Sequence, residues 1–142
     1  MSQYMNLIGQ NAKKASLEKI NTKTKNKILK RYASLLDIEK NSIIIENTKD
    51  IKFALKKGLK KNLVDRLTIN YKKLDDIKVS INKIIKLKDP IDNTLEKWSR
   101  PNGLKIKRVS IPIGVIGVIY ESRPNVTSDV ASLCFKSGNA VI

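Results

Sequence analysis

The chain has 142 residues, and its 29 Lys and Arg side chains outnumber 13 Asp and Glu side chains to give a formal net charge of +16. This length is compatible with a single domain. One cysteine excludes an intrachain disulfide framework, and the lack of an apolar run of about 20 residues excludes a transmembrane helix. Polar residues also interrupt the apolar positions of residues 1–20, unlike in a signal peptide, and so we expect a cytoplasmic protein without a membrane partner.

The excess positive charge lies in the first 110 residues, because the four charged residues after that point sum to zero: Glu121, Arg123, Asp129 and Lys136. The lysines are scattered among isoleucines and asparagines, whereas nucleic-acid sites more often cluster arginine with aromatic residues. A genome of biased base composition would also produce such enrichment. We therefore expect no nucleic-acid partner, and a small basic helical nucleic-acid-binding protein stays open as the alternative.

Periodic apolar residues predict a helical region over residues 1–93. Amphipathic helices are expected over residues 3–19, 23–36 and 71–87, with a short helical turn over residues 62–67. Asn21 and Asn70 precede two of these helices and can act as N-caps. Residues 42–51 are ambiguous, because three consecutive isoleucines favour a strand while the following residues have a helical period. Gly58 can end that segment.

A β-hairpin is predicted over residues 94–110. Two short strands, residues 94–100 and 104–110, flank Pro101-Asn102-Gly103, which supplies turn residues and a left-handed position. Trp98 lies on the first strand, where it suits either local core packing or a subunit interface.

A strand–loop–helix–strand unit follows from residue 111 onward. The apolar run over residues 114–120 predicts a strand buried on both faces, as in a parallel sheet. Helical spacing begins at Val126, where Thr127 or Ser128 can act as the N-cap, and residues 139–142 begin a second, parallel strand. Because two strands cannot bury both faces of a sheet, we expect these residues to be part of a longer protein.

The loop between the first strand and the helix is the expected ligand site. Ligands of such units bind beyond the carboxyl ends of the strands, close to a helix N-terminus. Here that position is occupied by Tyr120, Glu121, Ser122, Arg123, Pro124 and Asn125.

Two segments are specific enough to compare with known families: Gly-Val-Ile-Gly-Val-Ile-Tyr-Glu-Ser-Arg-Pro-Asn-Val (114–126) and Ser-Leu-Cys-Phe-Lys-Ser-Gly-Asn-Ala-Val-Ile (132–142). They closely resemble the gamma-glutamyl phosphate reductase (glutamate-5-semialdehyde dehydrogenase) family of the aldehyde dehydrogenase superfamily. Shorter segments of the chain agree as well, namely residues 47–50, 64–67, 88–90 and 98–106.

The resemblance implies an α/β, aldehyde dehydrogenase-like fold, represented by its N-terminal part. Residues 1–93 would be a helical region that packs on the cofactor domain. The resemblance also favours a helix over residues 42–51. Residues 94–110 would be a β-hairpin that takes part in subunit association, as in superfamily relatives. Residues 111–142 would be the start of an NADP-binding, Rossmann-like parallel-sheet domain.

The implied reaction is NADPH-dependent reduction of L-glutamyl 5-phosphate to L-glutamate 5-semialdehyde and phosphate in L-proline biosynthesis. In the family, a cysteine attacks the acyl phosphate, phosphate leaves, and hydride reduces the thioester. That cysteine lies beyond residue 142, and so this chain alone is expected to be inactive. The resemblance also implies a homo-oligomer and a functional link to glutamate 5-kinase. Another acyl-phosphate or aldehyde dehydrogenase of the superfamily stays open.

Asn125 is the candidate catalytic residue, because superfamily relatives place an asparagine after this strand to donate an N–H to the oxyanion. The alternative is a helix N-cap. Arg123 is the candidate for binding a substrate anion, and the alternative is a surface salt bridge to Glu121 or another carboxylate. The resemblance assigns cofactor contacts to Tyr120, Glu121, Ser122 and Pro124.

Three other residues suggest chemistry but are interpreted as structural. Cys134 falls on the apolar face of its helix, as a buried thiol would. Gly114 and Gly117 lie within a strand and lack the spacing of a dinucleotide fingerprint, which indicates close packing. No metal site is expected.

Overall fold

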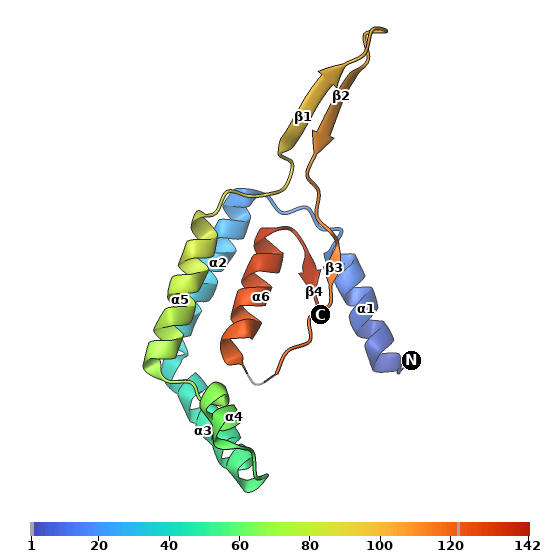
Figure 1. Cartoon of the computed structure of the whole chain (residues 1–142). Coiled ribbons are helices and arrows are strands. Elements are labelled where there is room, and N and C mark those ends of the chain that lie inside the picture. The colour runs from blue at the N-terminus through green and yellow to red at the C-terminus, as the bar shows by residue number, and fades with distance from the viewer. Residues whose placement is uncertain (1, 122) are drawn as a thin grey trace.

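The structure, a computed structural model, describes residues 2–121 and 123–142. Figure 1 shows a helical body with a two-stranded ribbon projecting from it. The elements follow in the order α1 (Gln3–Ala15), α2 (Thr22–Ile38), α3 (Lys40–Lys56), α4 (Lys61–Leu67), α5 (Tyr71–Lys86), β1 (Thr94–Ser99), β2 (Lys105–Val109), β3 (Val115–Ile116), α6 (Pro124–Lys136) and β4 (Ala140–Val141).

Side-chain caps begin several helices where the sequence predicts them. The Asn21 Oδ1 accepts a hydrogen bond from the Thr24 N–H at the start of α2, and the Asn70 Oδ1 accepts one from the Lys73 N–H at the start of α5. Such caps satisfy N–H groups that have no partner within the helix. The first helix is shorter than expected, because the chain turns after Ala15 instead of continuing to residue 19.

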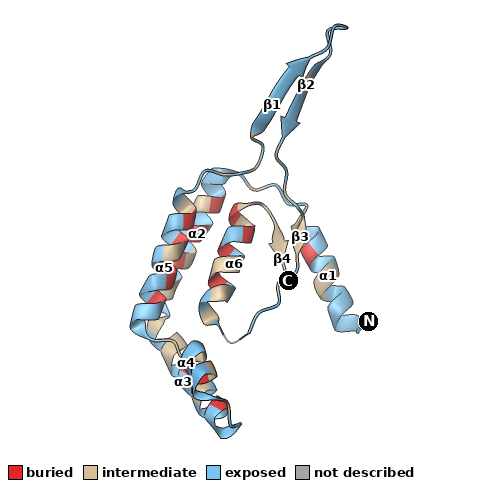
Figure 2. Cartoon of the chain, in the orientation of Figure 1, coloured by how far each residue is buried: buried red, intermediate tan, exposed pale blue. Residues whose placement is uncertain are grey.

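The ambiguous isoleucine segment is helical and belongs to α3. Ile43 and Ile44 pack against the main core, and this burial outweighs their preference for strands. The core itself lies mainly between α2 and α5, with α6 against them, as the red positions in Figure 2 show. Its buried members are Leu29, Ala33, Leu74, Ile77, Ile81 and Ile84.

The predicted hairpin is formed by β1 and β2, which pair antiparallel with Trp98 opposite Ile106. Gly103 adopts a φ of 84° at the turn, a left-handed conformation that glycine tolerates best. The ribbon projects away from the helices and is almost wholly pale blue in Figure 2. Trp98 is 37 % exposed, so it does not contribute to the core of the described structure.

The strand–loop–helix–strand unit has the predicted parallel pairing, with Val115 opposite Ala140 and Ile116 opposite Val141. The strand is much shorter than residues 114–120, because β4 offers only two paired residues. Within these residues burial on both faces is not observed, because Val115 and Ile116 are half-buried and Ile119 is fully exposed. Two strands alone leave both faces of the sheet open, so the burial expected of this strand in a longer protein stays a prediction.

Helix α6 begins at Pro124 and not at Val126. Proline is well suited to the first helical position, because its fixed φ is helical and its missing N–H would have no helical partner. Arg123 is the N-cap and makes no side-chain capping bond. The predicted caps are therefore wrong, and Ser128 is instead buried inside the helix. The left-handed stop after α6 is at Gly138, whose φ is 71°.

Candidate functional site

A pocket of about 260 Å³ lies where α4 and α5 approach the N-terminal turns of α6. We call it the α5–α6 pocket. Its lining residues are Arg66, Ile69, Lys73, Asp76, Ile77, Ser80, Pro124, Asn125 and Asp129.

An adjoining hollow of about 360 Å³, the outer pocket, is lined by Asp65, Arg66, Lys73, Arg123 and Asn125. The two pockets share three lining residues, and so they form one continuous region beside the loop that the sequence singled out.

Asn125 is the second residue of α6 and not its N-cap. Its Nδ2 donates a long hydrogen bond of 3.5 Å to Asp129 Oδ2, one turn further along the helix. The other carboxylate oxygen of Asp129 accepts a hydrogen bond of 2.8 Å from Ser80 Oγ on α5. The N-cap interpretation of Asn125 is therefore wrong. Its amide lines both pockets and is held loosely on one side.

Arg123 lines the outer pocket with its side chain exposed. Within residues 2–121 and 123–142 it forms no ion pair, including none with Glu121. The salt-bridge interpretation thus finds no support in the described structure. The guanidinium faces a hollow that it shares with Arg66.

Of the other loop residues that the structure describes, Tyr120 and Glu121 are exposed and Pro124 is half-buried. The Tyr120 hydroxyl is hydrogen-bonded to Thr127 Oγ1, which ties the end of the β3 segment to the first turn of α6. Pro124 lines the α5–α6 pocket, and Glu121 is exposed. Ser122 lies outside the described residues.

Cys134 is buried on α6, and this burial raises the pKa of its thiol. A raised pKa reduces the thiolate fraction, and the thiolate is the nucleophilic form. The structural interpretation of this cysteine agrees with its environment.

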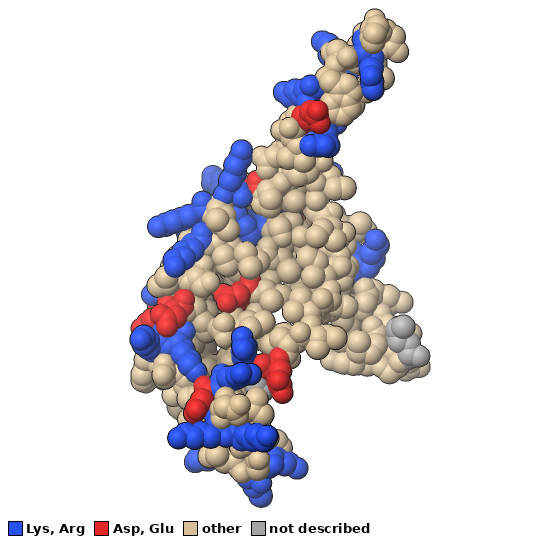
Figure 3. Space-filling model, in the orientation of Figure 1, with Lys and Arg blue, Asp and Glu red and all other residues tan. Residues whose placement is uncertain are grey.

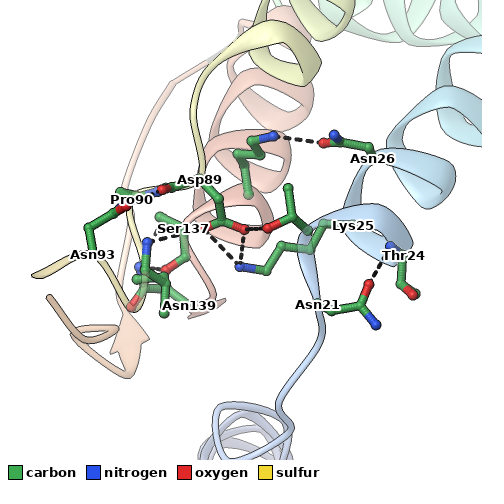
Figure 4. Close-up of polar contacts among 12 residues, drawn as sticks. Asn21, Thr24, Lys25, Asn26, Asp89, Pro90, Asn93, Ser137 and Asn139 are labelled. Atoms are coloured by element: carbon green, nitrogen blue, oxygen red, sulfur yellow. Dashed lines mark hydrogen bonds and ion pairs between the residues drawn. The ribbon is translucent and has the colours of Figure 1, made fainter. Parts of the chain in front are cut away.

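A polar layer fixes the opposite end of α6. Lys136 is 3 % exposed, and its Nζ donates to Asn26 Oδ1 at 2.7 Å and to the carbonyl of Ile85 at 3.2 Å. Figure 4 shows this contact beside a second buried lysine, Lys25, which pairs with Asp89 at 3.0 Å. These contacts join α2, the end of α5 and the end of α6, and so they hold the helices that form the pocket.

The sequence did not indicate the part of the site that comes from α4 and α5. Arg66, Lys73 and Ser80 lie some 40 to 60 positions before Asn125, and no local pattern connects them to it. The one available signal was the spacing of Asn125 and Asp129, which are neighbours on a helical face.

Figure 3 shows Lys and Arg side chains spread over the body and the hairpin on the face in view, with Asp and Glu groups among them. No described helix is both long enough and apolar enough to cross a membrane.

No family model matches the chain. Curated relatives do match it: it is 46 % identical over 139 residues to gamma-glutamyl phosphate reductase of Clostridium botulinum (strain Alaska E43), covering 96 % of this chain and 33 % of the relative. It is likewise 46 % identical over 142 residues to gamma-glutamyl phosphate reductase of Sulfurihydrogenibium, covering 99 % of this chain and 32 % of the relative.

The solved structures that match this chain are gamma-glutamyl phosphate reductases as well. The crystal structure of gamma-glutamyl phosphate reductase from Thermotoga maritima superposes with a TM-score of 0.89 at 41 % identity, over 93 % of this chain and 32 % of that one. The resemblance to gamma-glutamyl phosphate reductases is confirmed. The Saccharomyces cerevisiae gamma-glutamyl phosphate reductase gives a TM-score of 0.90 at 31 % identity, over 99 % of this chain and 36 % of that one.

These matches also confirm the expected aldehyde dehydrogenase-like fold. The chain spans about a third of the length of the gamma-glutamyl phosphate reductases that it matches.

Proposed function

We propose that the protein carrying this chain is an NADPH-dependent reductase that converts L-glutamyl 5-phosphate to L-glutamate 5-semialdehyde and phosphate in L-proline biosynthesis. The observation that supports this most strongly is the agreement with gamma-glutamyl phosphate reductases in sequence and in structure over nearly the whole chain. We further propose that it acts in the cytoplasm, as a homo-oligomer, on the product of glutamate 5-kinase.

In this proposal Asn125 donates its side-chain N–H to the oxygen that becomes negatively charged when a thiolate attacks the acyl phosphate. A donor fixed in place before the reaction contributes more in the transition state than in the ground state. The amide lies at the mouth of the pocket, where its one described side-chain contact is the long 3.5 Å bond to Asp129. Cys134 is unsuited as the nucleophile because it is buried and its pKa is raised. The nucleophile would come from outside these residues.

The loop after β3 suits a dinucleotide in general terms, because it follows the carboxyl end of a parallel strand and leads into a helix N-terminus. We assign the contacts to Tyr120, Glu121, Ser122 and Pro124. When bound, the cofactor supplies the hydride. The hydrogen bond between the Tyr120 hydroxyl and Thr127 Oγ1 holds the start of this loop against α6.

The forward reaction tests this proposal in the full-length protein that carries the chain. Glutamate 5-kinase, ATP and L-glutamate generate the acyl phosphate in the cuvette, and the oxidation of NADPH is followed by absorbance. We expect oxidation that requires every component of the kinase reaction, together with an aldehyde that a hydrazine reagent traps. Absence of oxidation while the kinase is active would refute the reductase function, and equal rates with NADH would refute the preference for NADPH.

The same assay tests the role of Asn125. We expect Asn125→Ala to lower kcat by about 10²- to 10³-fold, the usual effect of removing one oxyanion donor. Asn82→Ala is a matched control, because Asn82 is also an exposed helical asparagine but lies outside both pockets. Near-normal turnover by Asn125→Ala would assign this side chain a purely structural role.

A further inference from the structure

We propose that the α5–α6 pocket and the outer pocket together bind the α-amino-acid end of the substrate. The α-carboxylate would be bound by Arg66 and Arg123, and the α-ammonium group by Asp129. This inference rests on the proposed function, and it identifies the part of the chain that would recognise a glutamyl group.

Charged side chains of both signs line the two pockets. The α5–α6 pocket is lined by Arg66 and Lys73 but also by Asp76 and Asp129. A site for phosphate alone would be expected to present donors without facing carboxylates, because like charges disfavour the complex. An α-amino acid has an ammonium group and a carboxylate bonded to the same carbon. Such a zwitterion matches a pocket that is lined by both basic and acidic side chains.

Asp129 has unused hydrogen-bonding capacity. This side chain is half-buried, and an ionised carboxylate has about four acceptor positions. One oxygen accepts from Ser80 Oγ at 2.8 Å, but the other has only the 3.5 Å contact from Asn125. Within the described part of the chain Asp129 has no cationic partner. An ammonium group bound there would form a charge-assisted hydrogen bond.

Two of the three cations that line the pockets are available to bind the carboxylate. The Lys73 ammonium donates to the carbonyls of Thr68 and Asp65, where it caps the end of α4. Arg66 and Arg123 both line the outer pocket, and neither forms an ion pair among the residues that the structure describes. A guanidinium binds a carboxylate through two parallel N–H groups, and so these two arginines suit that ligand.

The walls of the pocket fit the rest of an amino acid. Ile69, Ile77 and Pro124 provide an apolar lining for methylene groups. Asn125 lines both pockets, so a bound amino acid would extend past the side chain that we propose as the oxyanion donor. The charged end of the substrate would thereby be anchored beside the position where the acyl group reacts.

The test is a titration of the isotope-labelled full-length protein by nuclear magnetic resonance with three probes: L-glutamate, glutarate, which lacks the amino group, and 4-aminobutyrate, which lacks the α-carboxylate. We expect L-glutamate to shift backbone resonances of α4, α5 and the first turns of α6. Each truncated probe should bind at least about tenfold more weakly, the usual effect of losing one charged partner.

Two variants and two matched controls complete the experiment. Asp129→Asn should lower the affinity for L-glutamate by about tenfold and leave the affinity for glutarate unchanged. Arg66→Gln should lower the affinity for both probes by a similar factor. Arg66 is exposed, so its replacement leaves the core intact. Asp92→Asn and Arg100→Gln make the same chemical changes outside the pockets, and both should bind like the parent chain.

If glutarate bound as tightly as L-glutamate, the site would recognise an anion without recognising the amino group, and the proposal would be overturned. Shifts confined to other elements, or no shift, would also overturn it. The titration involves no turnover, so its failure leaves the reductase assay to be judged independently. A chain that binds L-glutamate in a protein without reductase activity would refute the proposed function alone.

Discussion

The Lys25 side chain of α2 is buried against the segment that leads to the hairpin. Its ion pair with Asp89 offsets the free-energy cost of burying the charge. The lysine is 4 % exposed, and its Nζ lies 3.0 Å from Asp89 Oδ2. The carboxylate also accepts hydrogen bonds from Thr22 Oγ1 at 2.8 Å and from the Ile91 N–H at 3.1 Å. Burial opposes ionisation of Asp89, but these donors outweigh it and lower its pKa below the ordinary value of 3.8.

This environment predicts a loss of stability in acid. Because the pKa of Asp89 is lower in the folded chain than in the unfolded chain, its contribution is complete above the ordinary value of 3.8 and is lost as the pH falls through the folded value. Asp89→Asn should lower the free energy of unfolding near neutral pH by about 3–5 kcal/mol, since it leaves Lys25 buried without a carboxylate. It should also remove part of the acid dependence.

Urea denaturation over a series of pH values measures both effects. Asp75→Asn is the matched control, because the ion pair of Asp75 with Lys40 is exposed and should contribute less than about 1 kcal/mol. Equal destabilisation by the two variants would contradict the role that we assign to Asp89.

The residues that sequence alone located correctly act through local geometry. The Asn21 and Asn70 caps and the left-handed Gly58 and Gly103 each depend on a few neighbouring positions. Lys136 shows the limit of such reasoning. Its position near the end of α6 is no sign of burial, yet it bonds to Asn26, which lies 110 positions away. Such contacts depend on tertiary packing, which a single sequence does not specify.

At the scale of elements, the sequence predicted most helices and the hairpin but not their limits. Helix α3 contains three consecutive isoleucines, and only the core on which Ile43 and Ile44 pack decides its structure. Helix α6 begins two residues earlier than its apolar spacing indicates, because Pro124 is favourable in the first turn. Half of the candidate site could be located because it lies on one loop. The other half comes from α4 and α5 and could not.

The hairpin is the element for which an association role remains a prediction. Its strands are almost fully exposed, and Leu95, Trp98 and Val109 present apolar side chains to solvent. Isolated two-stranded ribbons are marginally stable in water, which favours a partner surface. We expect the full-length protein with residues 94–110 replaced by a short glycine-serine linker to have a smaller mass in light scattering than the parent protein. An unchanged mass would exclude the hairpin from the subunit interface.

At the scale of the whole molecule, the arrangement brings distant parts of the chain to one place. The α2–α5 core supports α6, the polar layer around Lys25 and Lys136 fixes the end of α6 that leads to β4, and the other end of α6 opens toward the two pockets. Residues from α4, α5 and the loop after β3 therefore surround one region. This geometry, with the agreement over a third of the gamma-glutamyl phosphate reductases, is the basis of the proposed activity.

The most direct measurement of that activity is the phosphate dependence of the reverse reaction in the full-length protein. In that direction the thiolate adds to L-glutamate 5-semialdehyde, hydride passes to NADP⁺ to leave a thioester, and inorganic phosphate displaces the thiolate to release L-glutamyl 5-phosphate. We predict that sustained reduction of NADP⁺ requires phosphate. Reduction at the same rate without phosphate, with L-glutamate as the product, would indicate a hydrolytic aldehyde dehydrogenase and contradict the proposed function.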